Sequence, residues 1–308
     1  MGDASNITFI TLDGFVELHK YRYLCFVIMF TAYVLIISCN STIVCLIVIH
    51  RNLHEPMYIF IAALLANSVL FSTNIYPKML IDFLSEKQVI SSSLCSFQGF
   101  IYYTLAGSEF LLLAAMAYDR YVSICKPLQY PTIMRKRRVN IFLVLAWITP
   151  ACELTLSGAI NAERKLCNFT LKGIFCTNLV YKLQCVISGA QFIYGAAVLV
   201  IISLFPTLFI LFTYIRILII SYRSCKTVRR KAAQTCLPHL LALINFSCFF
   251  TYDVITGRME TDITETVHLV ITLQMILYHP LLNPIIYGVK MKEIYKHIKR
   301  LFCQVKSQ

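Results

Sequence analysis

Long apolar blocks alternate with short polar segments along nearly the whole chain. Residues 23–49 contain no charged side chain, and this block is longer than the roughly 20 residues that an α-helix needs to cross a bilayer. Six further apolar blocks follow at about residues 56–81, 94–118, 139–162, 186–214, 232–252 and 266–289. The pattern predicts an all-α membrane protein with a seven-transmembrane helix bundle over residues 23–289. Residues 1–22 form the N-terminal segment, and residues 290–308 form a short amphipathic helix and tail.

Composition excludes a soluble protein of this length. Hydrophobic residues make up 58% of the chain and charged residues only 14%, which leaves too little polar surface for a water-soluble domain. The first twenty residues are polar and acidic, without the basic and apolar regions of a signal peptide. We therefore expect no cleaved signal peptide, and the first span itself acts as the insertion signal.

The distribution of basic residues predicts the orientation. If the N-terminus lies outside, 19 of the 28 Lys and Arg residues fall on the inner side, opposed only by Glu55, Asp119 and Glu293. Cytoplasmic loops carry such an excess of Lys and Arg, so we expect the N-terminus outside and the C-terminus in the cytoplasm. The net charge of +13 is then a feature of the cytoplasmic face that attracts anionic membrane lipids, and not a nucleic-acid footprint. Glycosylation sequons at Asn6 and Asn168 fall on the outer side.

Four of the 13 cysteines fall on the oxidising outer side: Cys95 before the third span, and Cys167, Cys176 and Cys185 in one loop. Four cysteines allow three pairings, and the sequence alone does not choose among them. The even spacing of the loop cysteines argues that the middle one points away from its neighbours. This favours Cys95–Cys176 with Cys167–Cys185. A metal site is disfavoured, because no His accompanies these cysteines in the loop.

Five segments carry a resemblance to a known family. They read LHEPMY (53–58), PKML (77–80), MAYDRYVSICKPLQY (116–130), KAAQTCLPH (231–239) and PLLNPIIY (280–287). In this order and spacing, the chain resembles the olfactory (odorant) receptors, a branch of the rhodopsin-like G-protein-coupled receptors, over nearly its whole length. The resemblance implies a multi-pass plasma-membrane receptor without a cofactor. Such a receptor binds a small organic odorant between the outer helix halves and activates a stimulatory-type heterotrimeric G protein, raising cyclic AMP.

Two other function classes stay as alternatives. A non-olfactory rhodopsin-like receptor would share the fold, but the PMY and KAxxTCxxH segments argue against it. A transporter would show paired broken helices from an internal repeat and ionisable residues along a pathway, and the sequence shows neither. An enzyme is disfavoured because the chain offers no nucleophile–base–acid set, no Gly-rich phosphate loop and no HExxH motif.

The adjacent charges Asp119 and Arg120 close the third span. An unpaired guanidinium at the membrane boundary is costly, so the pair is interpreted as a latch that the inactive state satisfies locally. Snorkelling of Arg120 to the interface is the alternative. Pro284 removes a backbone hydrogen bond, and Asn283 is expected to satisfy the freed groups. The resemblance adds further G-protein coupling or switch residues: Tyr121, Tyr214, His239 and Tyr287.

The chain departs from the family at two positions within the spans. Ser68 replaces the usual Asp of the second span, while Glu109 lies deep in the third. We hypothesise that Asn40, Ser68, Glu109 and Asn283 form a polar core that holds sodium or a proton. The alternative is a protonated, hydrogen-bonded Glu109 without an ion. In the sixth span, Ser247 replaces the expected Tyr, which puts the usual aromatic toggle in doubt.

The ligand chamber is predicted by position along the spans. Its expected lining is apolar and aromatic: Tyr102, Tyr103, Ala106, Gly107, Val198, Ile202, Ser247, Phe250, Val254, Leu273 and Ile276. No Lys, Arg or Asp is expected at that depth, so a small, largely uncharged ligand fits best. Amine ligands are disfavoured, because Tyr102 stands where amine receptors keep an Asp. Acidic ligands would meet basic residues nearer the mouth, namely Arg164, Lys165, Lys172 or Arg258.

Overall fold

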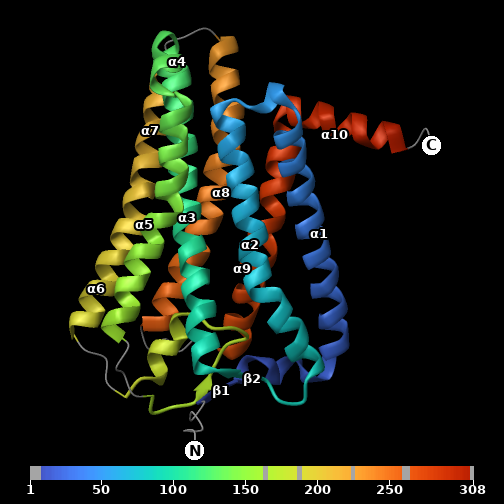
Figure 1. The fold of residues 1–308 in the computed structure, drawn as a ribbon, viewed down its shortest axis with the longest axis vertical. Coiled ribbons are helices and arrows are strands. Elements are labelled where there is room, and N and C mark those ends of the chain that lie inside the picture. Colours follow the sequence, from blue (N-terminus) through green and yellow to red (C-terminus); the bar gives the residue numbers. More distant parts are fainter. Residues whose placement is uncertain (1–7, 162–165, 186–188, 223–225, 259–263, 306–308) are drawn as a thin grey trace, which may run out of the picture.

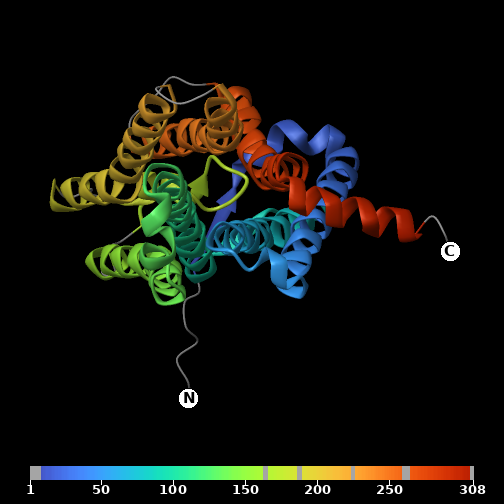
Figure 2. The same ribbon diagram turned by 90° about the horizontal axis from the view of Figure 1, so that it is seen from above.

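The computed structural model describes residues 8–161, 166–185, 189–222, 226–258 and 264–305. Long helices run side by side as a bundle (Figures 1 and 2). They are α1 (Arg22–Ile49), α2 (Pro56–Leu84), α3 (Ser92–Cys125), α5 (Lys136–Asn161), α6 (Gly189–Leu199) with α7 (Phe205–Tyr222), α8 (Lys226–Arg258) and α9 (Glu265–Lys290). Six of the described spans are long and apolar enough to cross a membrane, and Leu240–Thr256 within α8 is a shorter apolar stretch. The predicted all-α, seven-helix class is confirmed.

Polar side chains of the spans lie inside the bundle among buried apolar ones, and apolar side chains cover its outer flanks, as a lipid solvent requires. In α1, Val48 and Ile49 are exposed on the bundle surface, while Asn40 is fully buried. Glu109 and Asn283 are likewise buried at 1% exposure. Polar groups inside hydrocarbon must be satisfied by the protein itself, so they gather where helices face one another.

A short π-helical turn, η5 (Val200–Leu204), joins α6 to α7 within one span. The backbone N–H of Phe205 bonds to the carbonyl of Val200, five residues back. Pro206 follows and has no N–H of its own, so the regular ladder is interrupted there. The wider turn accommodates this interruption, and such turns are frequent at functional sites.

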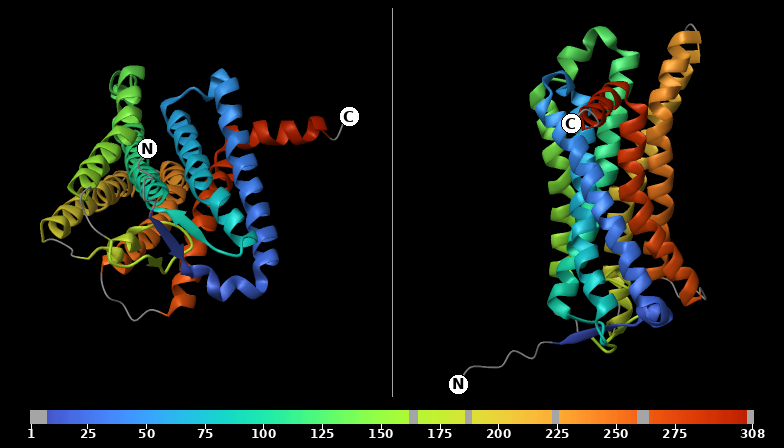
Figure 3. Two further views of the ribbon diagram at one scale, coloured as in Figure 1. Left: turned by 60° about the horizontal axis from the view of Figure 1, so that its bottom comes forward. Right: turned by 90° about the vertical axis from the view of Figure 1, so that its right-hand side faces the viewer.

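The two ends of the bundle differ (Figures 1 and 3). At one end, here called the α10 end, the helix α10 (Lys292–Val305) leaves the bundle sideways. The links η2 (Arg51–Leu53), η3 (Pro127–Gln129) and α4 (Tyr130–Ile133) lie at that end too. The predicted helix after the seventh span is therefore present as α10. Its described part is amphipathic, with Ile294 buried and Lys296 exposed.

A small sheet covers the opposite end, here called the sheet end (Figure 3). Its central strand β1 (Phe9–Leu12) pairs antiparallel with β2 (Val89–Ser91) and parallel with β3 (Thr170–Leu171). Ile10 and Leu12 point inward and are buried, whereas Phe9 and Thr11 are exposed, which is the alternation of a strand. A 3₁₀ segment, η1 (Asp13–Tyr21), then leads into α1. The sequence did not predict this sheet.

The loop before α6 folds into the bundle at the sheet end. Disulfides join Cys95 to Cys176 and Cys167 to Cys185, which are the two pairs favoured from the sequence. The loop segment from Ile174 to Asn178 is buried, and η4 (Asn178–Leu183) follows it. The loop is thus tied to the start of α3 and covers the helices beneath it.

Candidate functional site

The carboxylate of Asp119 is fully buried at the α10 end and is bonded on both oxygens. Arg120 donates to Oδ2 from Nε at 3.0 Å and from Nη2 at 2.5 Å, while the Tyr130 hydroxyl donates to Oδ1 at 2.8 Å. The Arg120 side chain is 15% exposed. Arg120 therefore lies against its neighbour and does not snorkel free of it. Tyr130, on the link α4, was missed in the sequence although it ends the quoted motif.

The remaining predicted switch residues lie on α3 and on three further helices, α7, α8 and α9. Tyr121 is half-buried beside the pair, Tyr214 on α7 is 4% exposed, and Tyr287 on α9 is 1% exposed. Both of the last two rings therefore point into the bundle. The side chain of His239 lies outside the described residues. The switch role of Tyr214 and Tyr287 stays a prediction.

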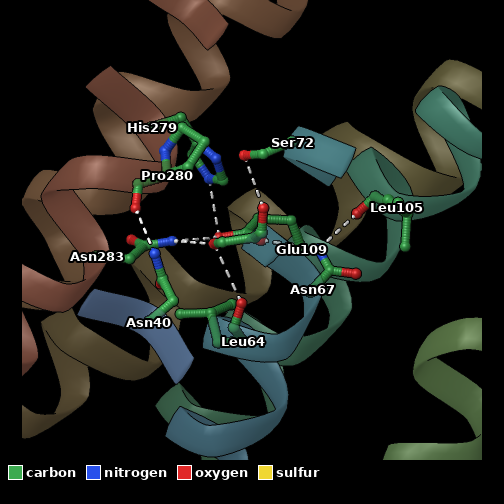
Figure 4. A network of polar contacts seen from close by, with 10 residues as sticks. Asn40, Leu64, Asn67, Ser72, Leu105, Glu109, His279, Pro280 and Asn283 are labelled. Atoms are coloured by element: carbon green, nitrogen blue, oxygen red, sulfur yellow. Dashed lines mark hydrogen bonds and ion pairs between the residues drawn. The ribbon is translucent and has the colours of Figure 1, made fainter. Parts of the chain in front are cut away.

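A network of hydrogen bonds surrounds Glu109 in the middle of the bundle (Figure 4). The Asn67 amide donates to Oε2 at 3.0 Å, and the Asn283 amide donates to Oε1 at 3.2 Å. Nε2 of His279 lies 2.9 Å from the same Oε1, with a side chain that is 4% exposed. Three nitrogen groups from α2 and α9 thus face one carboxylate on α3.

The predicted polar core is only partly brought together. Ser68 belongs to it, because the Asn283 amide donates to its hydroxyl at 3.2 Å. Asn40 lies elsewhere in the network, where its amide donates to the carbonyls of Ile36 and Pro280 and not to Glu109. Asn67 and His279 were missed as ligands of the carboxylate. A His in an apolar span next to the NPxxY segment was the available signal, since intramembrane ionisable residues are functional by default.

The two prolines of α9 explain two further contacts. Pro280 and Pro284 lack an N–H, which frees the carbonyls four residues before each of them. The Tyr76 hydroxyl donates to the carbonyl of Ile276 at 3.2 Å, and the Asn40 amide donates to the carbonyl of Pro280 at 3.0 Å. Side chains from α2 and α1 therefore satisfy the freed acceptors. The expectation that Asn283 does so was wrong, because its amide is bonded to Ser68 and Glu109.

Several predicted ligand residues lie together near the sheet end. Tyr103 and Phe250 pack edge to face with ring centroids 6.2 Å apart, and the Tyr102 hydroxyl points to the Met275 sulfur at 3.1 Å. Gly107 is a packing position: a Cβ there would lie 2.8 Å from Ile202 and 2.7 Å from Pro150. The other predicted lining residues are buried or half-buried in the bundle: Ala106, Val198, Ser247, Val254, Leu273 and Ile276.

An acidic group was wrongly excluded from this region. Asp253 on α8 is only 7% exposed and accepts a hydrogen bond from the Tyr103 hydroxyl at 2.5 Å. It directly precedes the predicted lining residue Val254 and lies one turn beyond Phe250. Of the basic residues named for the mouth, Lys172 is exposed, while Arg164, Lys165 and the side chain of Arg258 lie outside the described residues.

Two grooves open on the flanks of the bundle, away from the predicted ligand residues. One, of about 500 Å³, lies between α2 and α3 and is lined by Leu70, Phe97 and Ile101 among others. The other, of about 450 Å³, lies between α3, α5 and α7. Neither groove is lined by a residue of the predicted chamber, so the chamber itself stays a prediction.

The predicted glycosylation sites differ in how far the structure describes them. Asn168 is exposed at the sheet end and accepts a hydrogen bond from the Thr170 backbone at 3.1 Å. Asn6 lies outside the described residues.

The fold and these contacts define a seven-helix membrane receptor with a charged pair at one end and a disulfide-tied loop at the other. The family model for olfactory receptors matches residues 26–305. Among similar human proteins, olfactory receptor 11A1 is 32% identical over 96% of this chain and 94% of its own length. Olfactory receptor 51E1 is 31% identical over 98% and 95%, and olfactory receptor 10K1 is 34% identical over 94% and 93%. The chain belongs to the olfactory receptor family. It is a multi-pass plasma-membrane protein, and its family consists of receptors and not of enzymes.

Proposed function

We propose that this olfactory receptor binds a small organic odorant near the sheet end and activates a stimulatory-type heterotrimeric G protein at the α10 end. The sheet end is then extracellular, in agreement with the excess of basic residues on the opposite side. Membrane lipids contact the exposed apolar flanks and the basic inner face. The observation that carries the proposal is the fully bonded Asp119 carboxylate, which gives the inactive bundle a defined contact to lose.

Packed aromatic rings connect the predicted ligand residues with the Glu109 network. Phe250 packs at 6.1 Å from Phe246, and Phe246 lies 4.5 Å from the His279 ring, which faces Glu109. Phe110 on α3 contacts both phenylalanines at 4.9 and 5.3 Å. A ligand that moves Phe250 therefore acts on the Glu109 network through packed side chains. The family carries a Tyr where this chain has Ser247, and these phenylalanine rings fill the role of that Tyr.

Of the two hypotheses for the polar core, the donor set favours a proton over sodium. Sodium is held by oxygen ligands, but three nitrogen groups are directed at Glu109, from Asn67, Asn283 and His279. The Asn67 orientation is fixed, because Trp147 donates to its Oδ1 at 3.2 Å while its amide donates to Leu105. We propose that Glu109 and His279 share a proton in the resting receptor and that the ion is not needed.

The sodium alternative has a direct test. Agonist potency is measured with external sodium and with N-methylglucamine at equal ionic strength. We expect the potency in sodium to equal the potency in N-methylglucamine, both for the wild-type receptor and for Glu109→Gln. A sodium effect that disappears in Glu109→Gln would establish the ion instead.

Cyclic AMP assays test the receptor function itself. Cells expressing the wild-type chain at their surface are exposed to a broad odorant panel, and we expect a dose-dependent rise for some members. Arg120→Ala should abolish the rise at equal surface expression, because the guanidinium is the group released toward the G protein. A matched control is Arg22→Ala, at the other end of the bundle. An unchanged response in Arg120→Ala would contradict the coupling role.

A further inference from the structure

The Asp253 carboxylate lies beneath the covering loop, between α3 and α8. It accepts the Tyr103 hydroxyl at 2.5 Å, and that hydroxyl in turn accepts the backbone N–H of Asn178 at 2.7 Å. Asn178 belongs to the loop that the Cys95–Cys176 disulfide ties to α3. One carboxylate thus connects two helices and the loop above them.

No basic side chain of the described residues pairs with Asp253. Among the described residues, the ion pairs join Lys78 to Asp82, Arg120 to Asp119, His279 to Glu109 and Lys296 to Glu293, and none of them includes Asp253. Burying a carboxylate without a cation is costly, and a phenol hydroxyl supplies a hydrogen bond without neutralising the charge. Asp253 differs in this respect from the buried Asp119 and Glu109, which each have a basic partner.

Aromatic rings cluster around Tyr103, whose hydroxyl is bonded to Asp253. Tyr102 and Tyr103 meet edge to face at 4.8 Å, Phe175 of the loop lies 5.4 Å from Tyr102, and Phe250 lies 6.2 Å from Tyr103. The faces of such rings attract cations, most strongly where water is excluded. A buried acid among aromatic rings is the arrangement that a compact organic cation complements.

On the basis of the receptor function above, we propose that Asp253 is the counter-ion for a ligand that carries a protonated amine on a small apolar or aromatic body. The ammonium group takes the place of the missing cation, and the body of the ligand packs on the rings of Tyr103 and Phe250. The argument against amines from the sequence rested on Tyr102, which stands where amine receptors keep an acid. Here α8 supplies the acid, and that acid is bonded to the hydroxyl of Tyr103, the residue that follows Tyr102 on α3.

The test compares ligands that share a hydrocarbon body and differ in the charge of their polar group. Cells expressing the receptor are exposed to aliphatic and arylalkyl amines, each with the alcohol and the carboxylate of the same skeleton, for example 2-phenylethylamine, 2-phenylethanol and 3-phenylpropanoate. We expect at least one amine to activate about tenfold more potently than its alcohol and its carboxylate. Asp253→Asn should remove that preference by lowering the potency of the amine about tenfold, while the alcohol stays within about threefold.

One control variant separates a lost charge from a damaged fold. Glu153→Gln neutralises an acid on α5, whose backbone carbonyl accepts the Tyr194 hydroxyl, and it should keep the preference for the amine. Surface expression is measured for each variant, and all potencies are compared at matched levels.

The outcomes are distinguishable. A receptor that responds to alcohols or carboxylates but to none of the amines overturns this inference and leaves the receptor function intact. An amine preference that survives in Asp253→Asn also overturns it. A surface-expressed receptor that responds to no member of the odorant panel overturns the proposed function and this inference with it.

Discussion

Replacing Tyr130 by Phe removes one hydroxyl from the Asp119 site and leaves the ring in place. That hydroxyl donates to Oδ1 at 2.8 Å, while Arg120 occupies Oδ2. A hydrogen bond to a charged group contributes about 1.5–3 kcal/mol, and we take the lower value because Tyr130 is only half-buried. If the bond exists only in the inactive state, its loss shifts the inactive-to-active equilibrium about tenfold. We therefore expect basal cyclic AMP to rise up to about tenfold in Tyr130→Phe.

The assay is ligand-free cyclic AMP normalised to the amount of receptor at the cell surface. Tyr118→Phe is the matched control, because Tyr118 packs on Phe142 with ring centroids 5.8 Å apart, and its hydroxyl makes no hydrogen bond among the described residues. Its basal signal should equal that of the wild type. Unchanged basal activity in Tyr130→Phe, alongside a rise in Asp119→Asn, would refute the role given to the hydroxyl. An equal rise in Tyr118→Phe would refute the reasoning as well.

The same bond predicts how basal activity depends on pH. Burial, and then the neighbouring Asp119, raise the pKa of the Tyr130 phenol. A raised pKa keeps the group protonated, and its hydrogen bond is lost only when the pH rises above that value. Basal signalling through this contact should therefore stay constant between about pH 6 and 8.

Three further changes test other parts of the fold. Asn40→Leu leaves the Pro280 carbonyl of α9 without its donor and should lower the free energy of unfolding by about 1–3 kcal/mol. The measurement is the melting temperature of the purified receptor, which should fall in Asn40→Leu but not in Thr42→Leu, a change on the exposed side of α1. Cys176→Ser removes a disulfide that spans 81 residues, and Cys167→Ser removes one that spans 18. Because a disulfide that closes a longer loop restricts the unfolded chain more, surface expression should fall further in Cys176→Ser. Equal losses would contradict this. Asn168→Gln should remove a glycan, detected as a lost glycosidase-sensitive mass shift; a wild-type chain without that glycan would argue against an extracellular sheet end.

The sequence was sufficient for the spans and for the residues whose roles are local. Apolar blocks long enough to cross a bilayer predicted the helices, because hydrocarbon tolerates little else. Asp119 and Arg120 could be paired from the sequence since they are adjacent. The helices run past the predicted ends, as α3 does in continuing to Cys125, because hydropathy marks the hydrocarbon boundary and not the end of a helix.

The partners of buried groups could not be predicted, since they come from distant segments. A proline shows which carbonyl loses its donor, but only the packed bundle shows that Tyr76 and Asn40 fill the two vacant positions. His279 reaches Glu109 across 170 residues of sequence. Asp253 was overlooked because counting along a helix gives a position and does not show which loop covers it. The strands at the sheet end are too short to give a periodic signal.

The central place of β1 in the sheet constrains the order in which the receptor is assembled. β1 lies near the start of the chain, while the segment that flanks it on one side, β3, is synthesised only after four spans have been inserted. The strands β2 and β3 do not pair with each other in the sheet order, so neither can replace it. With the sheet end extracellular, as proposed, the amino-terminal segment would wait in the lumen during biosynthesis with one edge of β1 open. Trimming into residues 9–12 removes the strand that pairs with both β2 and β3 and so joins the two loops.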